Sequence, residues 1–128
     1  MADTLTITAN AQVTGGPSMT NSVIQSVEAV DHVSVQLSAT STDVEVEVCP
    51  AALATRISFL AVKADTYTSL TYKVHTSGGT PVTLNAPHFL IGSGAVALMG
   101  ALPDKLFFSN AAGTVRNIEI LTGRDATP

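Results

Sequence analysis

The sequence has few charged residues, no tryptophan and a single cysteine, and each shortage excludes a class of protein or site. Charged residues make up 12% of the 128 residues, against roughly 25% in ordinary globular chains. The six Lys and Arg are widely spread and, with ten Asp and Glu, leave a net charge of −4. Because no basic patch exists to neutralise phosphates, nucleic acid is not an expected partner.

The single cysteine, Cys49, excludes an internal disulfide framework and is expected to be a small buried residue. The first residues have neither the basic nor the apolar region of a secretory signal. No apolar run approaches the roughly 20 residues of a membrane helix. We therefore expect synthesis in the cytoplasm and no membrane partner.

The clearest structural pattern is a central block of strand-like runs. Residues 57–64 are mostly apolar at both odd and even positions, so apolar side chains would point to both faces of a strand. This pattern predicts a central strand covered on both faces. Residues 69–76 alternate between apolar and polar side chains, as a half-buried strand does. The glycine pair 78–79 then predicts a turn, with residues 82–86 returning as the partner strand. We expect this hairpin to lie beside the central strand.

The rest of the chain repeats short alternating runs separated by turn residues. Residues 21–30 also fit a helical spacing, but their β-branched side chains favour an extended strand. Residues 40–42 are a plausible hairpin turn, and residues 122–128 a polar tail. The further expected strands are 3–13, 32–39, 43–49, 105–109 and 114–121. The sequence predicts one all-β domain over residues 1–128, an antiparallel β-sandwich or jelly roll of about eight strands.

Two segments carry candidate interface residues. The N-terminal strand within residues 1–13 is rich in small residues, and we expect it at an edge or exchanged with a neighbouring subunit. Its apolar side includes Leu5, Ile7 and Val13. Phe107 and Phe108 are adjacent, so in a regular strand one ring faces outward, either as an interface anchor or packed under a loop.

No set of residues predicts catalysis or a metal centre. His32, His75 and His88 lack the close spacing of zinc ligands, so we expect solvent-facing strand or turn histidines. Alternating carboxylates at Asp43, Glu45 and Glu47 could bind a divalent cation or a basic partner. A solvated strand face that discourages edge pairing is the simpler interpretation. We therefore expect no enzyme and no cofactor.

From residue 57 onward the chain resembles small virion structural proteins of tailed bacteriophages, over about half its length. The matching segments are Phe59–Ala64, Tyr72–Val74, Val82–Leu84, Ala86–His88, Ser93–Val96, Pro103–Leu106, Ser109–Ala111, Ile118–Leu121 and Gly123–Asp125. They mark strands and turns, and no catalytic residue comes with them. The resemblance implies a β-sandwich fold and a structural role in the particle.

Similar small virion proteins decorate or cement capsids, often as trimers, or build tails and fibres. The resemblance therefore implies a capsid decoration protein on the virion surface, made in the host cytoplasm. Its partners would be the major capsid protein and further copies of itself, with a trimer favoured. The strand within residues 1–13 is the candidate for subunit exchange or for contact with the capsid. The alternatives are a tail, connector or fibre-base component, and a carbohydrate-binding module. The second is opposed by the absence of Trp and the presence of only two Tyr.

Overall fold

The computed structural model describes residues 3–125, which form ten strands, a short α-helix and two 3-10 helices. The elements in chain order are β1 (Asp3–Gln12), β2 (Ser18–Val27), β3 (Ala29–Leu37), β4 (Ser41–Glu47), η1 (Ala51–Arg56), β5 (Ile57–Ala64), β6 (Leu70–Val74), β7 (Val82–Thr83), β8 (His88–Ile91), α1 (Ser93–Val96), η2 (Ala97–Met99), β9 (Lys105–Asn110) and β10 (Arg116–Arg124). Among these residues, no helix is long and apolar enough to cross a membrane.

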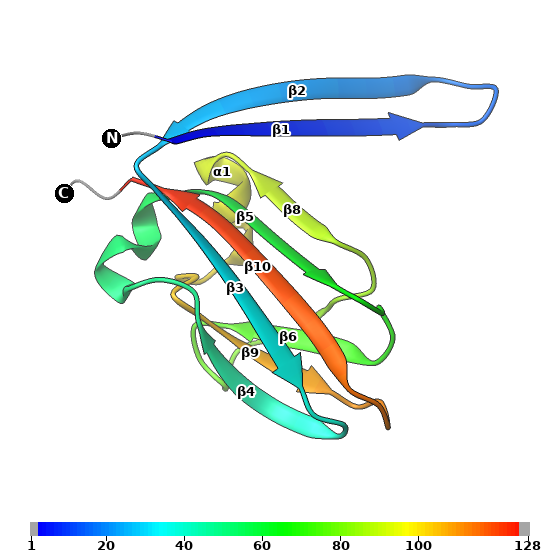
Figure 1. The fold of residues 1–128 in the computed structure, drawn as a ribbon, viewed down its shortest axis with the longest axis vertical. Helices are drawn as coiled ribbons and strands as arrows, with labels where there is room; N and C mark the ends of the chain where they lie inside the picture. Colours follow the sequence, from blue (N-terminus) through cyan, green and yellow to red (C-terminus); the bar gives the residue numbers. More distant parts are fainter. Residues whose placement is uncertain (1–2, 126–128) are drawn as a thin grey trace.

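Eight of the strands form a sandwich of two four-stranded antiparallel sheets, ordered β3-β10-β5-β8 and β4-β9-β6-β7 (Figure 1). Within them the first strand pairs with the last, β4 with β9, β5 with β8, and β6 with β7. Every connection except β6–β7 crosses from one sheet to the other. A long antiparallel hairpin rolled up in this way is a jelly roll, so the predicted all-β sandwich is confirmed.

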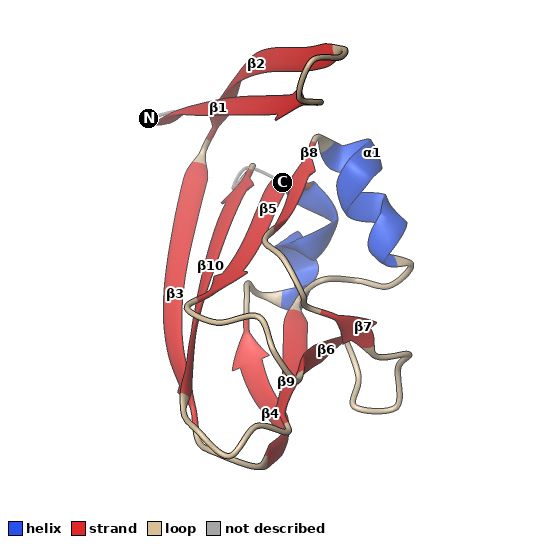
Figure 2. Cartoon of the chain, turned by 90° about the vertical axis from the view of Figure 1, so that its right-hand side faces the viewer, coloured by secondary structure: helices blue, strands red, loops and turns tan. Residues whose placement is uncertain are grey.

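The core lies between the two sheets, where alternate residues of each strand point inward. Its largest fully buried side chains include Phe108, Leu60, Leu106, Ile118 and Ile120. The outer side of β5 is covered as well, because β1 and β2 pack over it (Figure 2). The prediction that residues 57–64 form a central strand buried on both faces is therefore confirmed.

Several local predictions are wrong because sequence periodicity does not show which strands pair. Residues 40–42 do not close a hairpin, since β3 and β4 belong to different sheets. The β6–β7 hairpin forms, but in the sheet opposite β5. Residues 122–124 belong to β10 rather than to a tail, and Thr122 is buried. Residues 1–2 and 126–128 lie outside the described part of the chain.

The crossing between the sheets is held by one buried amide. Asn110 at the end of β9 donates from Nδ2 to the carbonyl oxygens of Ser38 and Thr114, at 3.1 and 2.9 Å. Its Oδ1 accepts from the backbone N–H of Ala112 at 3.0 Å. Because all these bonds join connecting segments, Asn110 fixes where the chain leaves β3 and enters β10.

Candidate functional site

The first two strands form a hairpin that projects from the sandwich, and we call residues 3–27 the arm (Figure 1). Residues 4–27 include no charged side chain. Residues directly opposite each other in the hairpin face the same side. One side of the arm therefore carries mostly hydroxyl and amide groups. The other carries Asn21, Gln25 and an apolar stripe made of Leu5, Ile7, Ala9, Ala11, Val13, Met19, Val23 and Val27.

The base of the arm is packed on the sheet that contains β3, β10, β5 and β8. Ile7 is 5% exposed and Val27 1% exposed, with Ile7 in contact with Phe59 and Ala61 of β5. The backbone N–H of Glu28 donates to the carbonyl oxygen of Arg124 at 3.0 Å. These contacts fix the direction in which the arm leaves the body.

A glycine on β10 allows this close packing. A Cβ built on Gly123 would lie 3.2 Å from Val27 Cγ1 and 3.3 Å from Leu5 Cδ2. Such distances are shorter than ordinary van der Waals contact, so a larger side chain at Gly123 would displace the base of the arm. This role could not be read from the sequence, because it depends on which strand lies above β10.

The distal arm, residues 8–22, is exposed along its whole length. Val13 is 60% exposed and Met19 75% exposed, although both belong to the apolar stripe. Across this segment, Thr20 Oγ1 donates a hydrogen bond to Asn10 Oδ1 at 2.9 Å. An isolated two-stranded hairpin is at best marginally stable in water. The distal arm is therefore an uncharged ribbon that is exposed on both sides.

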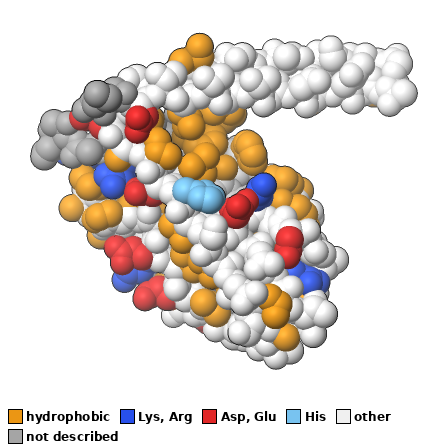
Figure 3. All heavy atoms as spheres, viewed as in Figure 1, with side chains coloured by type: hydrophobic (Ala, Val, Ile, Leu, Met, Phe, Trp, Pro, Cys, Tyr) orange, Lys and Arg blue, Asp and Glu red, His pale blue; other side chains and the backbone are white. Residues whose placement is uncertain are grey.

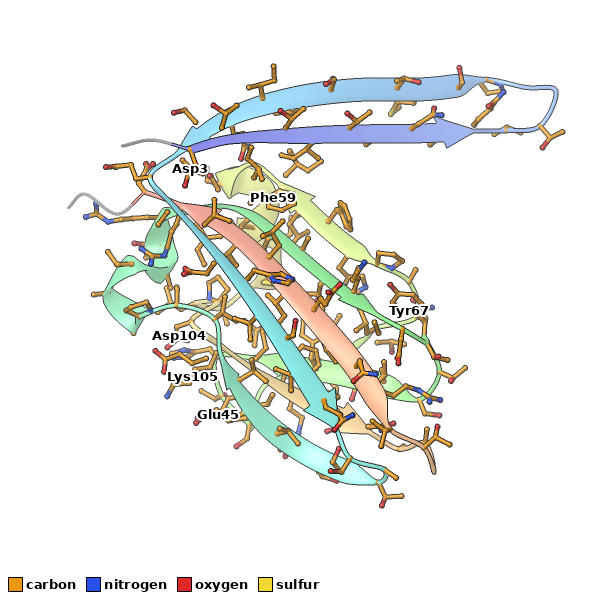
Figure 4. All side chains as sticks on the ribbon, viewed as in Figure 1. Asp3, Glu45, Phe59, Tyr67, Asp104 and Lys105 are labelled. Carbon is orange, nitrogen blue, oxygen red and sulfur yellow. The ribbon has the colours of Figure 1, made fainter. Side chains whose placement is uncertain are left out.

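Beside the arm base lies an apolar area on the same sheet, which we call the sheet patch and define as Phe59, Ala61, Phe89 and Leu121. Phe89 is 54% exposed and makes an edge-on contact with Phe59 at a centroid distance of 6.3 Å. The patch lines a hollow of about 230 Å³. Figure 3 shows hydrophobic side chains gathered beneath the arm, and Figure 4 shows Phe59 there.

Charged residues at the border of the sheet patch are already paired with one another. Lys63 Nζ lies 3.1 Å from Glu119 Oε2, and His32 Nε2 lies 3.7 Å from Glu119 Oε1. These pairs are solvent-exposed and contribute little to stability. They leave the patch itself without net local charge of either sign, which suits an uncharged apolar partner.

The structure places the five candidate interface residues differently from one another. Val13 is exposed near the tip of the arm, whereas Leu5 and Ile7 form its base. Phe107 faces outward on the sheet β4-β9-β6-β7 and is half-buried. Phe108 faces the core and is 0% exposed, so its assignment to an interface is wrong and only one of the two rings is available.

The acidic residues of β4 lie among lysines of their own sheet. Asp43 Oδ1 lies 3.1 Å from Lys73 Nζ, and Glu45 Oε1 lies 3.7 Å from Lys105 Nζ, a pair labelled in Figure 4. Within residues 3–125 there is no group of three or more His, Cys, Asp or Glu that could hold a metal ion. Two of the three carboxylates on β4, those of Asp43 and Glu45, are thus paired with lysines.

Two histidines make contacts that their spacing did not predict. His75 Nδ1 lies 2.7 Å from Oδ1 of the buried Asp104, whose carbonyl oxygen accepts from the N–H groups of Val48 and Cys49. This network joins the ends of β4, β6 and β9. Cys49 is buried as predicted, and burial raises the pKa of its thiol, which disfavours the reactive thiolate.

His88 is half-buried, because it lies opposite the core residue Val62 and its ring contacts Tyr72. Its Nδ1 is hydrogen-bonded to the buried hydroxyl of Tyr72 at 2.7 Å. Burial lowers the pKa of His88 and raises the pKa of Tyr72 to about 12. Both groups are therefore favoured in their neutral forms in the folded chain.

We expect the free energy of unfolding to fall at both ends of the pH range. Below pH about 6.5 the unfolded chain protonates His88 more readily than the folded chain does, so stability decreases as pH falls. Tyr72 ionises near 10 when unfolded and near 12 when folded, so its contribution, about 3 kcal/mol, is lost as pH rises from 10 through 12. Denaturant titration across pH measures both limbs.

Tyr72→Phe is the matched control, since it should flatten the alkaline limb relative to the wild type. An unchanged difference between pH 9 and pH 12 would contradict the assignment to Tyr72.

Comparisons of the chain with known protein families, with curated proteins and with solved structures return no match.

Proposed function

We propose that this chain is a structural protein of a bacteriophage virion that decorates and cements the outer face of the capsid. The observation that carries the proposal is the uncharged arm, fixed at its base on a jelly-roll body and exposed over residues 8–22. Such an element is suited to contacts with neighbouring proteins in an assembly. The resemblance of residues 57–125 to small virion proteins agrees with this role.

Such a protein acts by binding to the assembled capsid. A protein that binds the assembled shell, and not its separate subunits, shifts the equilibrium toward the assembled shell. Few long charged side chains need to be ordered on such a surface, because charged residues are 12% of the chain. Jelly rolls also occur in viral capsid and lectin domains, which supports the proposal by analogy of fold alone.

The proposal places the protein on the virion surface, with the major capsid protein and further copies of the chain as partners. A trimer is favoured by the resemblance. Neither a cofactor nor a catalytic step is part of the proposed role. The proposed site residues are those of the arm and, on the second sheet, the outward ring of Phe107.

The deciding measurement is the copy number of this polypeptide in purified particles of the phage that encodes it, by quantitative staining against the major capsid protein. A number comparable to that of the shell protein is the expected result. A handful of copies would instead indicate a tail, connector or fibre-base component. Complete absence from the particle would overturn the virion role, and a glycan array would then test the carbohydrate-binding alternative.

A further inference from the structure

We propose that the distal arm docks on the sheet patch of a second copy of this chain. The inference specifies the self-association that the proposed function assumes, but its test requires no virion. The two surfaces involved are the apolar stripe of residues 8–22 and the uncovered part of the sheet patch, which is the exposed Phe89 and the half-buried Leu121.

The apolar stripe runs along one side of the arm, interrupted on β2 by Asn21 and Gln25, and the chain itself covers only its base. Leu5 and Ile7, at the base, already pack on Phe59, Ala61 and Leu121. Ala9, Ala11 and Met19 continue the same side of the ribbon with the same kind of side chain. The intramolecular contact therefore shows which chemistry the stripe fits, and the distal stripe repeats that chemistry.

The arm base covers only part of the sheet patch. Phe59 and Ala61 are buried under the arm base, whereas Phe89, one strand further toward the sheet edge, is 54% exposed. In the pairing of β5 with β8, Phe89 lies directly opposite Ala61, so the exposed ring continues the covered surface. The hollow of about 230 Å³ beside it is open to a further apolar strand.

The arm cannot use its own patch for this purpose. It is an extended ribbon whose tip points beyond the edge strand β8 (Figure 1). Its ten-residue strands span roughly 33 Å at about 3.3 Å per residue, and only the base half is packed. The distal stripe and the free part of the patch are therefore matched surfaces that one molecule cannot bring together.

No unpaired charge on either surface opposes docking on a second copy. Residues 4–27 offer no charged group to an acidic or a basic partner. Lys63, Glu119 and His32 at the border of the patch are paired among themselves. Within residues 3–125, no further strand pairs with either outer edge of the two-stranded arm, so backbone hydrogen bonds from strand addition can supplement the apolar contact.

The first test is sedimentation velocity of the purified full-length chain over a range of concentrations. The wild type is expected to self-associate. Ala11→Asp places a charge on the apolar stripe and should weaken self-association on the order of 100-fold, because the charge would be buried without a partner. Gln12→Asp is the matched control: it places the same charge on the hydroxyl-rich side, and we expect less than about a threefold change.

The second test separates the two surfaces by mixing. Phe89→Ser removes the exposed ring of the patch, and should abolish self-association as Ala11→Asp does. When the two variants are mixed, the intact arm of the Phe89→Ser chain can bind the intact patch of the Ala11→Asp chain. We expect complexes that contain both variants from a mixture of two species that are each monomeric alone. Leu98→Ser, at another exposed apolar position, should leave self-association unchanged.

A third variant guards against misfolding of the point variants. Replacing residues 8–22 with the dipeptide Asn-Gly joins the cross-strand partners Ile7 and Val23 by a short hairpin turn, and keeps the packed base. This chain should remain folded and monomeric, and its intact patch should bind the arm of the Phe89→Ser chain.

A wild-type chain that stays monomeric at every concentration would overturn the inference, as would a mixture that forms no complex. A monomer that binds purified shells through its arm would assign the arm to the capsid instead, and would leave the proposed function standing. A chain that self-associates through these two surfaces but is absent from virions would support the inference and overturn the proposed function.

Discussion

Replacing Phe108 with alanine is expected to lower the free energy of unfolding by about 3–5 kcal/mol, as large-to-small substitutions of buried aromatic residues do. Phe108 is 0% exposed and packs against Tyr72 at a centroid distance of 5.6 Å. It lies on β9, which pairs with both β4 and β6, so the cavity would open in the middle of the second sheet. Equilibrium denaturation by guanidinium chloride measures the change.

Phe107→Ala is the matched control, because it removes the same ring from the next residue of the same strand. Phe107 faces outward and is half-buried, so we expect a loss of about 1 kcal/mol. Equal losses for the two substitutions would show that the assigned register of β9 is incorrect. If Phe107→Ala instead weakens binding to the particle or self-association while stability is unchanged, the ring of Phe107 is an interface anchor.

Replacing Gly123 with valine is expected to detach the base of the arm while leaving the sandwich folded. The new side chain would overlap Val27 and Leu5, since even a Cβ lies 3.2 and 3.3 Å from their methyl carbons. Overpacking of this kind costs about 1–3 kcal/mol. Amide hydrogen exchange in residues 3–27 should therefore accelerate by about 10- to 100-fold, with β4, β6 and β9 unaffected.

Gly113→Val is the control for Gly123→Val, because a Cβ at Gly113 meets no atom within 4 Å. Its exchange pattern should equal that of the wild type. Uniform acceleration across the whole chain in Gly123→Val would mean that the arm base is an integral part of the fold. Detachment confined to the arm would instead establish the body as independently stable.

The firm base has a consequence for binding. Ile7 and Val27 are buried, and the backbone N–H of Glu28 donates a hydrogen bond to the carbonyl oxygen of Arg124. The arm is therefore held in one direction before it meets a partner. A pre-organised element loses less conformational entropy on association than a free tail does. Gly123→Val should for this reason weaken arm-mediated association even though the stripe itself is intact.

The sequence by itself determined the class of fold. Alternation in residues 32–39, 43–49 and 69–76 reports which side of each strand is buried, because that pattern is local to the strand. The continuous apolar run at 57–64 likewise reported a strand covered on both faces. The β8 strand was missed, since four residues after a proline are too few to show alternation.

Only the tertiary structure decided which strands pair and what covers them. The pairing of β3 with β10 joins residues some 80 positions apart, for example Leu37 with Arg116, and no local pattern encodes it. The sequence located an apolar stripe in residues 5–13 but not that its base is buried on Phe59 while its tip is exposed. The exposure of Phe89 and the close approach at Gly123 have the same origin. Each depends on contacts between segments distant in sequence, and these contacts exist only once the jelly roll has closed and the arm lies across it.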